Sequence, residues 1–173
     1  MTLLNFIVDP AVIVGEKGCF LIVNDAFTNL TGLSKKELIG TALLDINILT
    51  AESKVILLKN LMKRMQDLPV EPYEINFTDE TGKVRYVEIK AKKIDYAGQP
   101  ADLVIFRDIT QRKEALRGAE YKFRNISEQA NDAFIYLDKF GKILDVNAKA
   151  IEMFGGAKEK LLGKHFKDRH FLH

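Results

Sequence analysis

The amino-acid sequence repeats its own beginning, and this repeat constrains the fold more than any other feature. When the sequence is compared with itself at a shift of 123 positions, without a gap, identical residues coincide between residues 9 and 40 of the first copy. Most fall on turn-forming glycines, one helix-capping asparagine and apolar residues between them, and two are charged: Asp9 and Asp132, Gly18 and Gly141, Leu21 and Leu144, Val23 and Val146, Asn24 and Asn147, Gly32 and Gly155, Lys35 and Lys158, Leu38 and Leu161, Gly40 and Gly163. Such a repeat indicates one structural unit used in series.

The second copy is shorter than the first. The first continues through three more strand-like segments, whereas the second reaches His173 before they appear. We therefore expect a complete domain over residues 1–108, a helical linker over residues 109–130 and the front half of a second domain over residues 131–173. Because so short a segment rarely forms an adequate core, we expect the half domain to be loosely ordered or to borrow packing from a partner chain. We expect the second copy to be short because the sequence is a fragment of a longer protein, without its effector.

Composition excludes several functions. The formal net charge of +2 is too small to imply binding to nucleic acid or to a membrane. The single cysteine, Cys19, cannot form an internal disulfide, which favours a reducing cytoplasm. We find no apolar run of roughly 20 residues that would span a bilayer and no signal peptide.

The first 50 residues predict two strands followed by short helices. Residues 11–15 and 19–23 are β-rich, with a turn between Gly15 and Gly18. Asn24 is placed to cap a helix over residues 25–31, which Gly32 ends in a left-handed conformation. Ser34 and Glu37 form a capping-box pattern for a second short helix that closes at Gly40.

A longer helix and three strands complete the pattern. Residues 51–66 carry apolar side chains at helical spacing: Val55, Leu58, Leu61, Met62 and Met65. Residues 73–78 and 86–91 then alternate between apolar and polar, a turn is expected at residues 98–100, and residues 102–107 form a last strand. The predicted fold class is α+β: an antiparallel five-stranded sheet with its helices on one face.

Residues 109–130 change to a heptad spacing. Their apolar seam is Ile109, Arg112, Leu116, Ala119, Phe123, Ile126 and Ala130, with Arg112 a poor seam residue. We favour a dimeric coiled coil, in which Leu116, Ala119, Phe123 and Ile126 pair with a second copy of the chain. The alternative is a merely amphipathic connector.

Several short motifs in this order resemble those of PAS sensory domains. Residues 24–27 (Asn-Asp-Ala-Phe), 31–32 (Thr-Gly) and 37–40 (Glu-Leu-Ile-Gly) are similar to the PAS signature, and residues 106–110 (Phe-Arg-Asp-Ile-Thr) resemble the Asp-Ile-Thr ending that leads into an output helix. The resemblance covers residues 5–110 in full, and residues 131–166 repeat the front signature.

The resemblance implies the input region of a signal-transduction protein, most often a prokaryotic sensor histidine kinase of a two-component system. It implies that a small pocket lies beneath the short helices. Asp108, Ile109 and Thr110 would anchor the output helix, so that changes in the pocket bias that helix. A ligand does so only if it binds two states of the core unequally.

The pocket, if occupied, is expected to be apolar. Our candidates for its lining are Leu44, Ile48, Leu57, Leu61, Phe77, Ile89 and Ile105. The competing interpretation is that these side chains simply fill the core. Asp79 and Glu80 lie in a predicted turn, where solvation explains them better than acid–base catalysis.

Residue types that the sequence lacks argue against two cofactors. Residues 1–164 contain no histidine to ligate haem, and residues 40–49 lack the cysteine of a covalent flavin photosensor. The sequence leaves open whether the domain binds a flavin noncovalently or binds another small molecule. The three histidines His165, His170 and His173 do not match a zinc motif, and no metal site is expected.

The sequence thus predicts a non-catalytic sensory module that binds a small ligand or another signalling domain and conveys the change along residues 109–130. The main rival is a ligand-free module for dimerisation or protein interaction, with a filled core. A small α+β enzyme is improbable because no polar cluster converges in the pocket. No phosphate-binding loop, nucleophile elbow or kinase signature is found.

Overall fold

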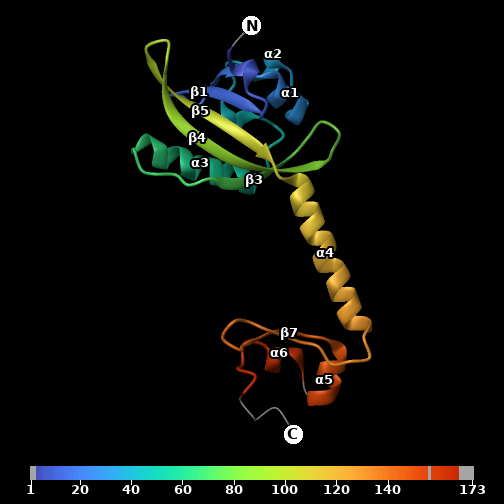
Figure 1. Cartoon of the computed structure of the whole chain (residues 1–173). Coiled ribbons are helices and arrows are strands. Elements are labelled where there is room, and N and C mark those ends of the chain that lie inside the picture. Colours follow the sequence, from blue (N-terminus) through green and yellow to red (C-terminus); the bar gives the residue numbers. More distant parts are fainter. Residues whose placement is uncertain (1–2, 156, 168–173) are drawn as a thin grey trace. The chain divides into compact units, whose positions relative to one another are not determined.

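The computed structural model describes residues 3–155 and 157–167 (Figure 1). The chain divides into two compact units, Met1–Lys113 and Glu114–His173. Each unit is described by itself below.

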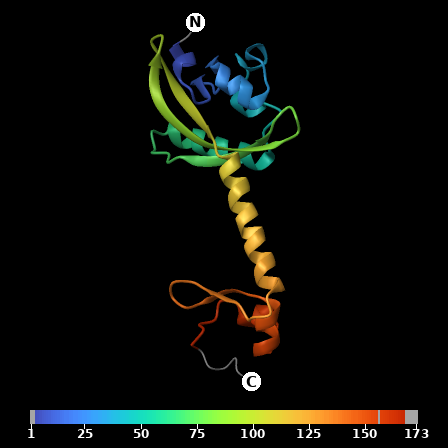
Figure 2. The same cartoon turned by 45° about the vertical axis from the view of Figure 1, so that its right-hand side comes forward.

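The first unit is built on one antiparallel five-stranded sheet, as the alternation predicted. Its strands are β1 (Ala11–Gly15), β2 (Phe20–Val23), β3 (Tyr73–Thr78), β4 (Val84–Tyr96) and β5 (Gln99–Asp108), in the spatial order β2-β1-β5-β4-β3. Figures 1 and 2 show the long β4–β5 hairpin, in yellow-green, crossing the middle of this unit. The α+β fold class is confirmed.

The helical segments of this unit precede β1 or connect β2 to β3. They are η1 (Leu3–Phe6), α1 (Asp25–Thr31), α2 (Lys35–Leu38), η2 (Leu43–Asp45) and α3 (Ala51–Met65). The expected caps are present. The Asn24 side chain accepts a hydrogen bond from the Phe27 backbone N–H, and Gly32 ends α1 with φ +79°. Ser34 and Glu37 form a complete capping box. Local sequence chemistry therefore fixes where these helices begin and end.

The turn between β4 and β5 lies earlier than the sequence predicted. Ala97 and Gly98 both have positive φ angles, and Tyr96 pairs directly with Gln99, which is the geometry of a two-residue hairpin turn. Pro100 therefore lies inside β5, not in the turn. It is tolerated because β1 ends at Gly15, opposite Ala101, so that the backbone of Pro100 has a neighbouring strand on one side only.

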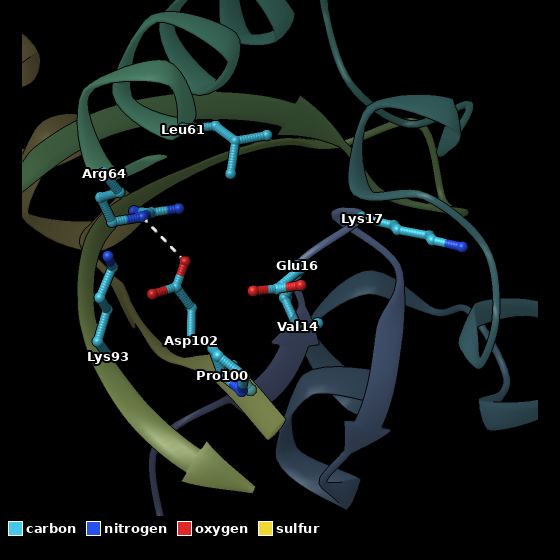
Figure 3. A pocket seen from close by; sticks show the side chains of 10 residues that line it. Val14, Glu16, Lys17, Leu61, Arg64, Lys93, Pro100 and Asp102 are labelled. Atoms are coloured by element: carbon cyan, nitrogen blue, oxygen red, sulfur yellow. Dashed lines mark ion pairs between the residues drawn. The ribbon is translucent and has the colours of Figure 1, made fainter. Parts of the chain in front are cut away.

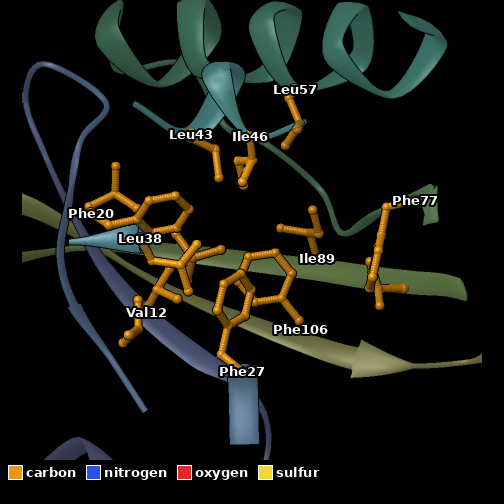
Figure 4. Packing of buried hydrophobic residues seen from close by; sticks show 14 of the residues in the cluster. Val12, Phe20, Phe27, Leu38, Leu43, Ile46, Leu57, Phe77, Ile89 and Phe106 are labelled. Carbon is orange, nitrogen blue, oxygen red and sulfur yellow. The ribbon is translucent and has the colours of Figure 1, made fainter. Parts of the chain in front are cut away.

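The sheet buries apolar side chains on both faces. On the helical face, Phe20, Phe27, Leu57 and Phe106 belong to the main core cluster, and Figure 4 shows these side chains filling the space between the sheet and the helices. The opposite face carries a smaller cluster around Leu4, Ala11, Ile13 and Ala101, with η1 contributing to it.

Helix α3 turns a different face to the core than the apolar spacing indicated. Val55, Leu58 and Met62 are largely exposed, Leu61 is half-buried, and the side chain of Met65 lies outside the described part. The buried positions are Ser53, Leu57 and Arg64. Ser53 is buried because its hydroxyl donates to the Asn76 carbonyl (2.6 Å) and accepts from the Asn76 backbone N–H (3.1 Å) of β3.

The second unit repeats the beginning of the first. Helix α4 (Thr110–Gln129), which starts in the first unit, is followed by β6 (Ile135–Leu137), β7 (Ile143–Val146), α5 (Ala148–Phe154) and α6 (Lys158–Leu161). β6 and β7 form an antiparallel pair. A small core consists of Ile143, Val146, Ala150 and Leu161. The expectation that residues 131–173 are loosely ordered or borrow packing stays a prediction.

Candidate functional site

The space between the sheet and the helices of the first unit is nearly filled. The core cavity there has a volume of about 20 Å³, which is room for about one water molecule. The side chains that line it include Phe27, Leu57, Phe77 and Phe106. Small-molecule sites in proteins have volumes of about 300–1,000 Å³, so a flavin or a haem does not fit this cavity.

The predicted pocket residues are spread over three places. Ile48, Leu57 and Phe77 line the core cavity. Leu44 and Ile89 belong to the same core without lining the cavity, and Leu61 lines a separate cavity at the other end of the sheet. The prediction that Ile105 lines the pocket was wrong, because its side chain packs in the cluster on the opposite face of the sheet. Its neighbours Val104 and Phe106 face the helices, and successive residues of a strand point to opposite faces.

The start of α4 is bonded tightly to the end of the sheet. The Ile109 backbone N–H donates to the Tyr86 carbonyl (2.9 Å), and the Thr110 hydroxyl accepts from the Tyr86 backbone N–H (3.0 Å). Asp108 Oδ1 accepts from the Thr110 backbone N–H (2.8 Å), so it satisfies one of the free amides at the helix start. Ile109 and Thr110 are 5% and 2% exposed. The three residues expected to connect sheet and helix therefore lie together where β5 becomes α4.

A charged network extends this junction to the β3–β4 turn. Arg85 Nε donates to Asp79 Oδ2 (2.7 Å), and Arg85 Nη1 lies 3.8 Å from Asp108 Oδ2. The Thr81 hydroxyl and backbone N–H also donate to Asp79 Oδ1 (2.6 and 3.0 Å). These hydrogen bonds, from Thr81 first and from Arg85, hold the pKa of the Asp79 carboxyl far below its usual range, against an opposing effect of burial.

Asp79 and Arg85 were not found by sequence reasoning. The sequence places Asp79 in a turn, and solvation was taken to explain it, yet its side chain is buried and bonded on both oxygens. The signal was the spacing Asp79–Thr81–Lys83, since an aspartate at the start of a turn accepts from backbone N–H groups further along. The pairing with Arg85 depends on the register of β3 and β4, which the sequence does not show.

The predicted dimer seam lies on the surface of α4. Leu116, Phe123 and Ile126 are 57%, 58% and 68% exposed, and Ala119 is also exposed. Phe123 makes one ring contact, with Tyr136, at a centroid distance of 5.0 Å. Exposed apolar side chains at this spacing are available to a partner helix.

The described residues contain no group of three histidine, cysteine, aspartate or glutamate side chains that is placed to hold a metal ion. His165 is half-buried, whereas His170 and His173 lie outside the described residues. Cys19 is free and half-buried. Across the described ranges, none of the helices combines the length and the apolar character needed to cross a bilayer.

A five-stranded antiparallel sheet that holds short helices on one face and continues into a helix at its last strand is the architecture of a sensory-domain class. Comparison with known families agrees. The family model for the PAS domain matches residues 8–111, and the family model for the PAS fold matches residues 121–171. The chain belongs to the PAS domain family, whose members are sensory modules. The resemblance recognised in the sequence motifs is confirmed.

Individual relatives are distant. The chain is 25% identical over 161 residues to sporulation kinase A of Bacillus subtilis, a match that covers 90% of the chain and 26% of the kinase. The chain thus spans about a quarter of this relative's length. The PAS domain of a Desulfitobacterium hafniense protein is 20% identical with a TM-score of 0.52, covering 61% of this chain and 97% of that domain. A PAS domain from Colwellia psychrerythraea is 19% identical with a TM-score of 0.53, covering 62% and 92%. These two structures support the fold alone.

Proposed function

We propose that this chain is part of the sensory input region of a cytoplasmic histidine kinase, and that the first unit passes a change in its core to α4. The observation that carries this proposal is the junction at Asp108–Thr110. Ile109, directly before α4, and Thr110, its first residue, are both hydrogen-bonded to the backbone of Tyr86 in β4. A displacement of β4 relative to β5 therefore has to break these bonds or to move the helix.

The kinase context is supported by the match to sporulation kinase A, which extends over 90% of the chain. In a kinase, two copies of α4 would pair along Leu116, Ala119, Phe123 and Ile126. The resulting homodimer would carry the change toward an effector outside the chain.

A second candidate function is interaction without a ligand in the core. The observation that favours it is the core cavity of about 20 Å³. In this version the first unit responds to another signalling domain that binds its surface, and the output through α4 is unchanged. Native mass spectrometry of the purified chain separates the two versions, because a bound small molecule that is lost on denaturation supports a ligand. The same spectrum also reports whether the chain is a dimer.

Hydrogen exchange tests the transmission itself. Leu57→Ala loosens the core, and Leu58→Ala, on the exposed side of the same helix, is the matched control. We expect faster amide exchange at residues 110–116 in the first variant than in the control, with less change at residues 120–129. In a background that also carries Thr110→Val, Leu57→Ala should no longer speed up amide exchange at residues 110–116. Unchanged exchange at residues 110–116 in Leu57→Ala, while β4 and β5 exchange faster, would show that the junction transmits nothing.

A further inference from the structure

Helix α3 is inverted relative to an ordinary surface helix, because it buries polar side chains and exposes apolar ones. Ser53 and Arg64 are buried, whereas Val55, Leu58 and Met62 are 66%, 45% and 53% exposed. A helix on the surface of a globular protein normally turns its apolar side to the core. Single exposed apolar residues are common, but a continuous row of them on one element indicates a contact surface.

The buried side of α3 is held in place by specific contacts. Near the start of the helix, the Ser53 hydroxyl is hydrogen-bonded to the backbone of Asn76 in β3. In its last turn, Arg64 Nε lies 3.1 Å from Asp102 Oδ2 in β5, and Figure 3 shows the Arg64 side chain turned toward Asp102. Leu57, between them, points into the core (Figure 4). A rotation of α3 that buried its apolar row would break both polar contacts and expose Leu57, so the row stays on the surface.

The exposed row has the spacing of a coiled-coil helix. Its members lie at intervals of four, three and four residues, which is the alternation of d and a positions in a heptad: Ala51, Val55, Leu58 and Met62. We call these four residues the α3 stripe. Such a stripe packs against the apolar face of another helix. The spacing therefore fits a helix as the occupant.

Lysines flank the α3 stripe. Lys54 lies at a g position and Lys59 at an e position, which are the positions that contact charged residues of a partner helix. Lys63 follows Lys59 by one turn, and like charges at this spacing repel each other. Glu52 is the only acidic residue of the helix. Among the residues that the structure describes, none of the three lysines is paired with a carboxylate. The flanks thus favour a partner with negative charge.

A second copy of α3 does not meet this requirement. In a parallel pair, Lys54 of each copy would face Lys59 of the other, because a g position contacts the e position of the next heptad. In either direction, each copy brings the same excess of positive charge. Helix α4 also carries more basic than acidic side chains. The charge of the α3 stripe therefore points to a helix from another protein.

We propose that the α3 stripe binds an acidic amphipathic helix of a partner protein. Large apolar side chains of that helix lie along Val55, Leu58 and Met62, and its carboxylates lie against Lys54 and Lys59. The proposal rests on the second candidate function above, in which another signalling domain binds the surface of the first unit, and it names the surface and the chemistry of that partner.

The contacts of α3 connect this surface to the output helix. Arg64 joins α3 to Asp102 in β5, and the same strand ends at Asp108, which contacts the first residue of α4. A helix bound to α3 would therefore act on the strand that leads to α4, without a ligand in the core. Binding itself does not depend on this transmission, and the two are tested separately.

The test uses three designed helical peptides of three heptads each. The acidic peptide carries Leu at positions a and d and Glu at positions e and g. The basic peptide has the same Leu residues with Lys at e and g, and the third peptide keeps the Glu residues but has Ser in place of Leu. Each is titrated at pH 7 and low salt into the full chain, isotope-labelled at its methionine methyl groups. The methyl resonance of Met62, assigned with Met62→Leu, reports binding at the α3 stripe.

Three variants accompany the titrations. Val55→Glu places a charge within the α3 stripe. Lys54→Glu combined with Lys59→Glu reverses the charge of its flanks. The matched control is Lys36→Glu combined with Lys92→Glu, which changes the net charge by the same amount at exposed positions of α2 and β4.

We expect saturable shifts of the Met62 methyl resonance with the acidic peptide, and at least tenfold weaker binding of the other two peptides. Val55→Glu should weaken binding of the acidic peptide at least tenfold. The reversal at Lys54 and Lys59 should do the same and make the basic peptide the tighter of the two, whereas the control should keep the wild-type order. The comparison of the three peptides on the wild-type chain does not depend on how well a variant folds.

No saturation with the acidic peptide at 1 mM overturns the proposal. So does equal binding of the acidic and basic peptides, because the lysines would then select nothing. A Met62 methyl resonance that shifts with the concentration of the chain alone would assign the α3 stripe to a second copy, and would also overturn it. None of these outcomes changes the hydrogen-exchange result at residues 110–116, so a failure here is distinct from a failure of the junction to transmit.

Discussion

Asn24 and Asn147 make corresponding hydrogen bonds, 123 residues apart in the chain. Each side-chain oxygen accepts from a backbone N–H at the start of the first strand or directly before it, at Ala11 or Phe134, and from the first helix, at Phe27 or Ala150, always at 2.9 Å. Each amide nitrogen donates to carbonyls of the segment that enters the module: Leu4, Ile7 and Asp9 for Asn24, and Ser127 and Asp132 for Asn147. Both side chains are 1% exposed.

This equivalence gives the sequence repeat a physical reason. One asparagine joins the incoming segment, the first strand and the first helix of each module. In the second unit the incoming segment is the end of α4, since Ser127 lies in that helix. The repeat also extends to backbone N–H groups at the helix start, where Asp25 donates to Asn5 and Ala148 donates to Glu128. We infer that residues 3–6 occupy the position in the first module that the end of α4 occupies in the second.

The first prediction concerns Asn24. Asn24→Ala removes the cap of α1 and leaves buried carbonyls without a donor, so we expect it to lower the free energy of unfolding by about 2–4 kcal/mol. Asn24→Asp keeps the accepting oxygen but places a second oxygen against the carbonyls of Leu4, Ile7 and Asp9. It should be at least as destabilising at pH 7. Urea unfolding followed by circular dichroism measures both.

The matched control is Asn147→Ala in the second unit. Hydrogen exchange in this variant should become faster at residues 133–154 and stay unchanged at residues 11–31. A stable Asn24→Asp variant would mean that the donated hydrogen bonds contribute little, and that the cap alone explains the asparagine.

The second prediction tests whether the core is filled by its own side chains. Leu57 is 2% exposed and lines the core cavity. Leu57→Ala should lower the free energy of unfolding by about 2–5 kcal/mol, the usual cost of creating a cavity. Leu58→Ala, at a position that is 45% exposed, should cost less than about 1 kcal/mol. Equal and small losses in urea unfolding would contradict a core that is filled tightly around Leu57.

The third prediction follows from the pKa of Asp79, which is lower in the folded chain than in the unfolded one. The stability that the ionised carboxylate contributes is fully present above its unfolded pKa of about 4 and is lost as the pH falls below that value. Asp79→Asn should therefore be less stable than the wild type at pH 7, with a difference that narrows between pH 5 and pH 2. Urea midpoints over this range measure it, with Glu80→Gln as the control at an exposed neighbour. A difference that does not depend on pH would assign the effect to lost hydrogen-bond geometry, not to charge.

The parts of the fold that the sequence predicted correctly depend on local chemistry. As helix caps, Asn24, Gly32 and the pair Ser34–Glu37 bind backbone groups within four residues, so their spacing alone defines the short helices. The succession of strands along the chain followed from the alternation of apolar and polar residues and from the turn residues between them. The ion pair of Arg64 with Asp102, in contrast, joins residues that are distant in the sequence, and no pattern indicates it.

Where both faces of an element carry apolar residues, the sequence could not select the buried one. Helix α3 has one apolar stripe at Val55, Leu58 and Met62 and another near Leu57 and Leu61, and helical spacing fits both. The uninterrupted apolar run at residues 103–106 gives no alternation, because β5 buries side chains on both faces. For this reason Ile105 was assigned to the wrong side of the sheet.

The fourth prediction concerns the seam on α4. Leu116 and Ile126 are exposed and lie on one side of the helix, whereas Tyr121, which is 68% exposed, lies on the other. If the seam forms a coiled coil, Leu116→Glu places a charge in an apolar interface and should raise the dimer dissociation constant at least tenfold. Tyr121→Glu adds the same charge outside the seam and should leave the dissociation constant unchanged. Sedimentation velocity over a range of protein concentrations measures both variants. If Tyr121→Glu dissociates the dimer and Leu116→Glu does not, the interface lies on the other face of α4. A wild-type chain that stays monomeric at 300 μM would make α4 a connector without a pairing role of its own.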